Sequence, residues 1–250
     1  MCGIAGYIGD RNAPDILFDM LKRLEYRGYD SAGIACLAED IVCISKDKGR
    51  VYELEDKSKT ENIKSTLGIA HTRWATHGEP SYLNSHPHTD CLKEISVVHN
   101  GIIENHIHLR EELIKKGHTF TSETDTEVIP HLIEDNLPGD FEDAFINALG
   151  KLRGSFAVAC VYRGEPGKIF IARKDSPLVI GLGVGCNLVA SDMPALIPYT
   201  KKAIILDDFE YAIIEKNEIL VKDILSGEEI DKEIHEIQWD VEEAEKSGFK

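Results

Sequence analysis

The stretch Met1-Cys2-Gly3-Ile4-Ala5-Gly6-Tyr7-Ile8 opens the chain with alternating small and apolar residues, a pattern that predicts a strand over 3–8. The small side chain of Cys2 permits removal of Met1, which would make Cys2 the first residue. A free α-amino group titrates near pH 8, about where a thiol does, so a terminal cysteine carries its own base. The alternative is a small buried cysteine at the start of a strand, the commoner use of this residue. Both interpretations stay open on these residues alone.

The composition is that of an ordinary globular protein, with 42% hydrophobic and 29% charged residues in a chain of 250. The net charge of −16 disfavours nucleic acid and anionic membranes, both of which attract basic surfaces. No apolar run reaches membrane-spanning length, and the N-terminus lacks the regions of a signal peptide. We therefore expect a cytoplasmic protein that binds neither nucleic acid nor membranes.

The cysteines are too widely spaced for a disulfide framework or a zinc finger. They are Cys2, Cys36, Cys43, Cys91, Cys160 and Cys186. Cys91 is interpreted as a loop residue, and the four that lie among apolar or β-branched neighbours (36, 43, 160 and 186) are expected in the core. Two His-x-His pairs, at 86–88 and 106–108, would each face one side of a strand. No cysteine or acidic residue completes a tetrahedral set in sequence, so we expect no metal and no cofactor.

The rest of the chain predicts paired strands around a central block of helices. Apolar spacing predicts helices over 14–25, 109–116, 126–135 and 141–149. Short strands are expected over 32–37, 41–45, 67–71, 96–99, 156–162, 168–172, 178–183 and 188–191, with a strand-rich last third over 203–237. This order indicates an α+β layered fold with mostly antiparallel sheets. We expect one domain over 1–238, followed by a charged connector over 239–250.

The segment His71-Thr-Arg-Trp-Ala-Thr-His-Gly-Glu-Pro80 follows an apolar strand directly. Polar side chains at a strand end project into a cleft, where the guanidinium of Arg73 could clamp a carboxylate through paired N–H donors. The alternative is a solvated loop whose tryptophan packs onto the core. The segment alone does not decide between them.

Asn100-Gly101, within Val98-His-Asn-Gly-Ile-Ile-Glu104, allows two interpretations. Asn-Gly between β-like runs is a strong signal for a hairpin turn, with positive φ at both residues. The same atoms could instead serve catalysis, because the Asn100 amide and the Gly101 backbone N–H could together face a developing oxyanion.

A polar segment, Ser122-Glu-Thr-Asp-Thr-Glu127, precedes an apolar helical run. Thr124 followed by Glu127 fits a capping box, so we expect Thr124 to cap the helix. Asp125 suits the positive end of that helix, where a carboxylate stays ionised and could receive an ammonium group.

Taken together, these segments resemble the glutaminase domain of the class II glutamine amidotransferases, which are N-terminal-nucleophile hydrolases. The motifs that carry the resemblance are Tyr26-Arg-Gly-Tyr-Asp-Ser-Ala-Gly33, the segments 71–80, 98–105 and 122–128, Ser176-Pro-Leu-Val-Ile-Gly-Leu-Gly183 and Ala190-Ser-Asp192. They occur in the same order from Cys2 to about Lys250. The resemblance implies a four-layer αββα sandwich.

The resemblance also implies a role for each site residue. Cys2 would be the nucleophile, with its freed amine as the base, and Asn100 and Gly101 would form the oxyanion hole. The substrate-binding residues would be Arg73 for the α-carboxylate and Asp125 for the α-ammonium of L-glutamine, with Trp74, Thr76, His77 and His86 around the pocket. Trp74 would lie where ammonia leaves. Arg27 would lie near the nucleophile without a chemical step of its own.

Within that family the motifs are most similar to members that carry two sugar-isomerase domains after the glutaminase and pass ammonia to fructose 6-phosphate. The expected partners are therefore L-glutamine and sugar-isomerase domains of a longer protein, which we expect to be a homodimer. One alternative is the glutaminase domain of another class II enzyme, such as amidophosphoribosyltransferase or asparagine synthetase. Another is a non-catalytic module that senses glutamine.

Overall fold

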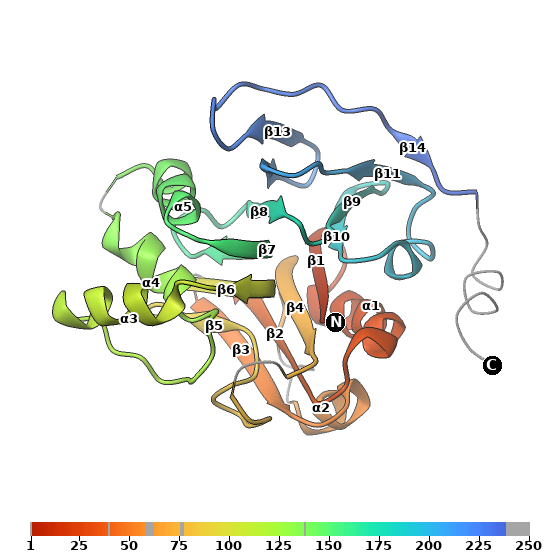
Figure 1. The fold of residues 1–250 in the computed structure, drawn as a ribbon. Helices are drawn as coiled ribbons and strands as arrows, with labels where there is room; N and C mark the ends of the chain where they lie inside the picture. The colour runs from red at the N-terminus through yellow and green to blue at the C-terminus, as the bar shows by residue number, and fades with distance from the viewer. Residues whose placement is uncertain (1, 40, 59–62, 76–77, 138, 239–250) are drawn as a thin grey trace.

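The computed structural model describes residues 2–39, 41–58, 63–75, 78–137 and 139–238. Two antiparallel β-sheets are stacked between two layers of helices, as Figure 1 shows. The α+β, four-layer αββα sandwich that the sequence predicts is therefore confirmed.

The first sheet has eight strands in the order β14-β11-β9-β10-β1-β4-β2-β3. Their bounds are β1 (Gly3–Gly9), β2 (Ser31–Ala38), β3 (Ile41–Lys48), β4 (Leu67–Arg73), β9 (Val179–Leu182), β10 (Cys186–Ala190), β11 (Lys202–Ile205) and β14 (His235–Glu236). Strand β1 lies inside the sheet, antiparallel to both β4 and β10, with Gly3 opposite Thr72. This register places Cys2, the residue before β1, beside the end of β4.

The second sheet has six strands in the order β13-β12-β8-β7-β6-β5. Their bounds are β5 (His88–Thr89), β6 (Ile95–Ile103), β7 (Gly154–Tyr162), β8 (Ile169–Lys174), β12 (Glu210–Ile214) and β13 (Ile219–Asp223). Strands β6 and β7 pair along their whole lengths, from Ile95 opposite Tyr162 to Ile103 opposite Gly154. Asn100 and Gly101 lie on this long pairing.

The helices divide between the two outer faces. Those that pack on the first sheet are α1 (Ala13–Leu24), α2 (Val51–Lys57) and the short 3-10 helices η1 (Glu25–Arg27) and η3 (Met193–Ala195). Those that pack on the second sheet are α3 (His106–Lys115), α4 (Val128–Asp135) and α5 (Phe141–Gly150). Helix α1 begins with Pro14 in its first turn and buries Leu17, Leu21 and Leu24 against the sheet, as its apolar spacing predicts.

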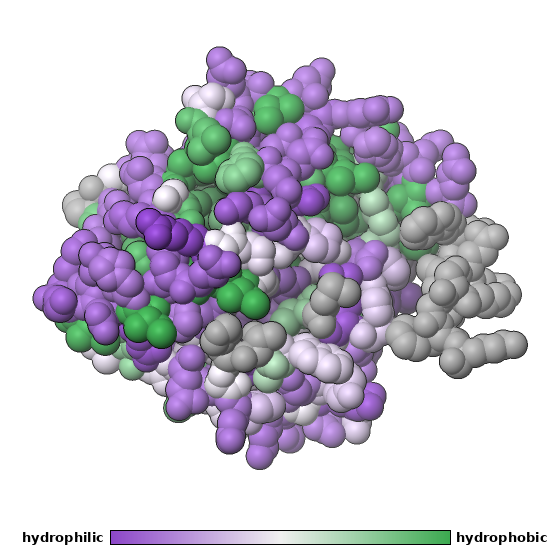
Figure 2. Space-filling model, viewed as in Figure 1, coloured by the Kyte–Doolittle hydropathy of each residue, from purple (hydrophilic) through white to green (hydrophobic). Residues whose placement is uncertain are grey.

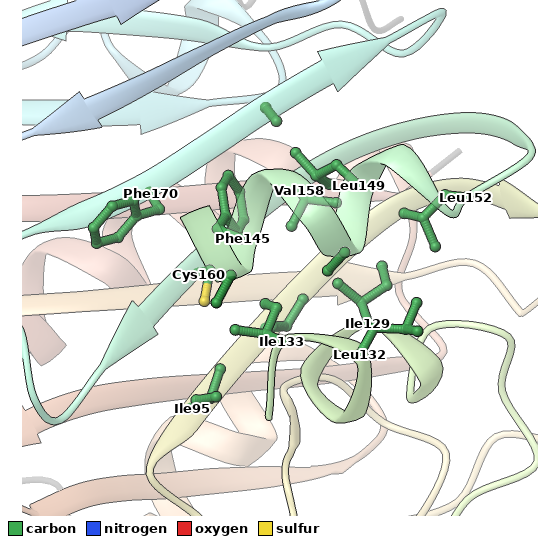
Figure 3. Close-up of a cluster of buried hydrophobic side chains, with 14 of the residues drawn as sticks. Ile95, Ile129, Leu132, Ile133, Phe145, Leu149, Leu152, Val158, Cys160 and Phe170 are labelled. Carbon is green, nitrogen blue, oxygen red and sulfur yellow. The ribbon is translucent and has the colours of Figure 1, made fainter. Parts of the chain in front are cut away.

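Three apolar cores separate the four layers. One lies between α1 and the first sheet and includes Leu17 and Ala70, and a second lies between the sheets and includes Ile4 and Val98. The third lies between the second sheet and α4 and α5, where Phe145 packs against Phe170 with ring centroids 5.8 Å apart (Figure 3). Each sheet is thus buried on both faces, which explains why its central strands are apolar almost throughout.

The interpretation of Asn100-Gly101 as a hairpin turn is wrong. Both residues lie inside the continuous strand β6, and only Gly101 has a positive φ, of +128°. An ideal Cβ on Gly101 would lie 2.1 Å from the backbone oxygen of Ser155 on the paired strand. Glycine is therefore required here by close approach of the backbone within a sheet, not by a turn.

The prediction that Thr124 caps the following helix is also wrong. Helix α4 begins at Val128, and Thr124 instead lies near His88, with 3.0 Å between its Oγ1 and the ring Nε2. The Glu127 carboxylate does reach back, but it accepts hydrogen bonds from the N–H and hydroxyl of Ser122. The acidic partner of the motif was predicted correctly, and its donor lies two residues earlier.

Figure 2 shows a face of the molecule that is mostly hydrophilic, with apolar residues in small groups. None of the helices in the described part of the chain is long and apolar enough to cross a membrane.

Cys36, Cys160 and Cys186 are buried as predicted, while Cys43 is only partly buried.

Candidate active site

The thiol of Cys2 lies where β1 and β4 meet. The backbone N–H of Trp74, the residue after β4, donates a hydrogen bond to its Sγ at 3.2 Å, and the thiol faces the Trp74 carbonyl oxygen at 3.5 Å. Burial raises the pKa of the Cys2 thiol, while the Trp74 N–H and the charge of Arg73 act in the opposite direction. A thiol held in this way needs a nearby base before it becomes a thiolate at neutral pH.

Two side chains fix the backbone of Cys2. The Arg27 Nε donates to the Cys2 carbonyl oxygen at 3.0 Å, and the Asn100 Nδ2 donates to the same oxygen at 3.1 Å. Arg27 is in turn held by Asp192, whose carboxylate accepts from its NH1 at 2.9 Å. Arg27 therefore positions the nucleophile from the side, which fits the place near Cys2 that the sequence comparison implied.

Asn100 is bonded at both ends of its amide. The Nδ2 also donates to the hydroxyl of Ser191 at 2.8 Å, and the Oδ1 lies 3.0 Å from His71 Nε2. Ser191 in turn accepts from the backbone N–H of Ile4 at 2.7 Å. Ser191 and Asp192 are thus site residues to which we gave no role in advance, although the Ala190-Ser-Asp192 motif contains both.

Arg73 ends strand β4 and is 4% exposed. Burial lowers the pKa of its guanidinium, and the negative charges of Asp30, Cys2 and Asp125 oppose that effect. Its NH2 donates to the Gly78 carbonyl oxygen at 3.1 Å. The charges of both Asp125 and the Cys2 thiolate thus act on Arg73, so the two residues expected to bind charged groups interact electrostatically.

Asp30 supports the loop that follows β4. Its backbone N–H donates to the Arg73 carbonyl oxygen at 3.2 Å, and its carboxylate accepts from the N–H of Ala75. Asp30 belongs to the motif 26–33, for which we predicted no role of this residue. Its contacts fix the main chain on both sides of Trp74.

Asp125 is 5% exposed and accepts a hydrogen bond from the backbone N–H of Ile103 at 2.8 Å through one oxygen. This bond ties the segment before α4 to the end of β6. A buried carboxylate held by a single backbone donor keeps acceptor capacity for a further cationic group.

Four buried imidazoles lie behind Asn100: His71, His86, His88 and His99. The rings of His71 and His86 stack with centroids 4.0 Å apart, and His86 meets His88 edge to face at 4.8 Å. Burial lowers the pKa of each ring, to about 3 for His71, so all four are neutral near pH 7. His86 thus reaches Asn100 through His71, and its contact with a substrate stays a prediction.

Trp74 is half exposed, and its ring meets Tyr29 edge to face with centroids 5.8 Å apart. Thr76 and His77, which we expected around the pocket, lie outside the described residues. The structure describes the other candidate site residues. Cys2 precedes β1, and Arg73 and Trp74 lie at the end of β4. Asn100 and Gly101 lie in β6, and Asp125 lies in the segment before α4.

Comparison with known families decides what this arrangement belongs to. Residues 71–198 match the model of the glutamine amidotransferase domain. The chain belongs to the glutamine amidotransferase family.

The sequence of this amidotransferase domain is similar along its whole length to glutamine–fructose-6-phosphate aminotransferase (isomerizing). It is 55% identical to the protein of Pyrococcus horikoshii over 252 residues and 53% identical to that of Thermococcus kodakarensis over 251 residues. The chain spans only 42% of the length of each of these relatives.

The fold is similar to that of a solved glutamine amidotransferase. Glutamine phosphoribosylpyrophosphate amidotransferase from B. subtilis, in complex with ADP and GMP, superimposes with a TM-score of 0.79 at 26% identity. The match covers 90% of this chain and 50% of that one.

Proposed function

We propose that this chain hydrolyses L-glutamine to glutamate and ammonia through a thioester on Cys2. With Met1 removed, the free amine of Cys2 takes the proton of its thiol, and the thiolate attacks the side-chain amide carbon of glutamine. The tetrahedral oxyanion collapses, the amide nitrogen takes a proton and leaves as ammonia, and a γ-glutamyl thioester forms. Water then attacks the thioester, releasing glutamate and restoring the thiol.

The observation that supports this proposal is a buried guanidinium, that of Arg73, which is within electrostatic reach of both the Cys2 thiol and the buried carboxylate of Asp125. Cys2 and Asp125 both lie close enough to act on the titration of Arg73. A guanidinium can clamp the α-carboxylate of glutamine by paired hydrogen bonds, and a buried carboxylate can hold the α-ammonium. Binding of both ends of the amino-acid group would direct the side-chain amide of glutamine towards the thiol.

The oxyanion would be held by the Asn100 Nδ2 and the Gly101 backbone N–H. The two amide protons of Asn100 already have acceptors, the Cys2 carbonyl oxygen and the Ser191 hydroxyl. We therefore propose that Asn100 exchanges or shares one of these acceptors when the oxyanion forms. Arg27, which also donates to the Cys2 carbonyl, keeps that carbonyl satisfied during the exchange.

The fate of the ammonia is proposed from the relatives. The names of the full-length relatives refer to glutamine and fructose 6-phosphate, and the chain covers 42% of their length. We propose that the domain supplies ammonia, past Trp74, to sugar-isomerase domains that form glucosamine 6-phosphate, within a homodimeric cytoplasmic enzyme. We also propose that Thr76, His77 and His86 line the glutamine pocket.

The test is an assay of glutamate release with Cys2→Ala and with a variant that carries one lysine inserted between Met1 and Cys2. Intact mass should show that the active protein begins at Cys2 and that the extended variant keeps Met1. Both variants should lose glutaminase activity, because one lacks the thiol and the other lacks the free amine.

Cys43→Ala serves as the matched control, since it removes a partly buried thiol from β3 and should keep full activity. Full activity of the extended variant would overturn the proposed base. Glutamine binding without hydrolysis in the processed protein would indicate a sensing module instead.

A further inference from the structure

We infer that Cys91, His118, His131 and Glu134 form a binding site for one zinc ion. Cys91 lies in the turn between β5 and β6, His118 follows α3, and His131 and Glu134 lie one turn apart on α4. One ligand atom from each of the four side chains lies within 4.8 Å of all the others. Sequence spacing did not reveal this set, and the expectation of no metal was based on that spacing.

Four of the six distances among the ligand atoms can be compared with those of a tetrahedral zinc site. The Sγ of Cys91 lies 3.7 Å from His118 Nδ1 and 3.6 Å from His131 Nδ1. A tetrahedral zinc with bonds of about 2.3 Å to sulfur and about 2.05 Å to nitrogen separates these atoms by about 3.5 Å. The carboxylate of Glu134 lies 2.8 Å and 3.2 Å from the same two nitrogens, against about 3.3 Å in such a site.

One carboxylate oxygen lies at the centre of the hydrogen bonds in this cluster. A single oxygen of Glu134 lies within hydrogen-bond distance of both Nδ1 atoms and also accepts the backbone N–H of Cys91. With both Nδ1 protons directed at that oxygen, neither ring nitrogen could accept a proton from the thiol between them. A cation at the common centre would use all four atoms, and a thiolate with a carboxylate would neutralise the charge of Zn²⁺.

The outer contacts also suit a metal. The outer ring nitrogen of His118 lies 3.7 Å from the Asp135 carboxylate, and that of His131 lies 4.0 Å from the Glu127 carboxylate. Imidazoles that bind zinc through one nitrogen commonly direct the other at a carboxylate. The backbone N–H of Thr119 donates to the Cys91 sulfur at 3.5 Å, a contact that stabilises a thiolate.

Four protein ligands would leave no open position, which is typical of a structural zinc rather than a catalytic one. The ligands His118 and His131 flank the segment that carries Asp125. A metal would therefore clamp α4, the loop after α3 and the β5–β6 turn, and stabilise the segment that presents Asp125. The exposed side chain of Cys91 gives the ion a path from solvent.

The test is the metal content of the purified chain, measured by mass spectrometry after dialysis, together with its cobalt-substituted spectrum. We expect about one zinc per chain, and in the cobalt form a thiolate-to-cobalt charge-transfer band with the strong visible absorption of a tetrahedral site. Cys91→Ser and His118→Gln should each lose the metal, and Cys91→Ser should lose the charge-transfer band. A chelator should lower the melting temperature of the wild-type chain by several degrees and leave that of Cys91→Ser unchanged.

Two control variants separate this site from other thiols. Cys43→Ser removes a partly buried thiol of β3, and Cys2→Ser removes the proposed nucleophile; both should keep the metal and the cobalt band. A chain without metal and without the band would overturn the inference. So would loss of the metal in Cys2→Ser with retention in Cys91→Ser. Because Cys2→Ser should bind zinc without hydrolysing glutamine, failure of the zinc site and failure of the glutaminase proposal give different results.

Discussion

Asn100 links three parts of the site at the scale of single atoms. Its Nδ2 donates to the Cys2 carbonyl and the Ser191 hydroxyl, and its Oδ1 lies within hydrogen-bond distance of His71. With Oδ1 facing the imidazole, the amide is fixed with its nitrogen towards the nucleophile. The neutral state of His71 matters here. Its Nε2 lies between Asn100 Oδ1 and the His99 carbonyl oxygen. A second proton on the ring would create a positive charge that is buried without a counter-ion.

We predict that Asn100→Ala lowers kcat for glutamine hydrolysis by about two to three orders of magnitude, the usual loss of one oxyanion donor. The change in KM should be much smaller, because the amino-acid end of glutamine is bound by Arg73 and Asp125 in our proposal. Steady-state kinetics of glutamate release measure both constants. Asn136→Ala, which removes an amide that bonds only within α4, is the control and should change neither. A loss confined to KM would show that Asn100 binds glutamine and does not stabilise the transition state.

At the scale of elements, strand β6 depends on glycine at one position. Gly101 has a φ of +128°, and a Cβ there would lie 2.1 Å from the Ser155 carbonyl oxygen. Gly117, after α3, also has a positive φ, of +101°, but a Cβ there would meet nothing within 4 Å. The two glycines therefore separate backbone strain from a clash between paired strands.

We predict that Gly101→Ala lowers the free energy of unfolding by more than about 2 kcal/mol, while Gly117→Ala costs about 1 kcal/mol, the strain of a positive φ alone. Gly101→Ala should also lose most glutaminase activity, because relief of the clash must move β6 away from β7 and carry Asn100 with it. Urea denaturation and the glutamate assay measure the two effects. Equal losses of stability in the two variants would contradict the clash.

The four buried histidines tie stability to pH. Their pKa values are lowered by burial in the folded state, whereas in the unfolded chain they return to about 6.5. Below about pH 6.5 the unfolded state binds more protons than the folded state. The contribution of these neutral rings to the free energy of unfolding is therefore fully present above that pH. It is lost as the pH decreases towards the folded pKa, about 3 for His71. Each ring that stays neutral contributes a slope of up to about 1.4 kcal/mol per pH unit in this window.

We predict that His86→Gln reduces this slope by the share of one ring, measured by urea denaturation between about pH 6.5 and about pH 5. His108→Gln is the control, because the His108 side chain is 71% exposed and gives up little water on folding. The absolute stability of His86→Gln is expected to fall at neutral pH as well, but the slope reports the buried ring itself. An unchanged slope would show that His86 is not held neutral by the fold.

The alternation of apolar residues placed most strands correctly, and the helical spacing of Leu17, Leu21 and Leu24 placed α1. Helix α2 was missed, since it is short and buries only Val51 and Leu54. The hairpin interpretation of Asn-Gly fails because local turn preference is outweighed by contacts with Ser155 on β7 and with Ser191 far along the chain. The charged and nucleophilic residues that we propose for the site come from motifs. Ser191, Asp192 and Asp30 act through contacts that spacing does not show.

At the scale of the whole molecule, the site lies where the two sheets meet. Strands β1 and β4 of the first sheet contribute Cys2 and Arg73, and β6 of the second sheet contributes Asn100. The core between the sheets, with Ile4 and Val98 in it, therefore sets the distance from the nucleophile to its partners. Trp74 is half exposed at this junction, so a second domain docked against it would meet the point where we propose that ammonia leaves.

This position leads to a prediction about the longer enzyme. A polypeptide that joins the chain to sugar-isomerase domains should hydrolyse glutamine several-fold faster with fructose 6-phosphate than without it, because acceptor binding would position Trp74 for the transfer of ammonia. The isolated chain should show no response, since it lacks the acceptor site in our proposal. Glutamate release by both proteins, with glucose 6-phosphate as the control sugar, measures the effect. Stimulation of the isolated chain by fructose 6-phosphate would place the acceptor site within these residues and contradict the proposal that it lies in the sugar-isomerase domains. Equal rates in the longer enzyme, with and without fructose 6-phosphate, would show that the glutaminase is active without a signal from the acceptor.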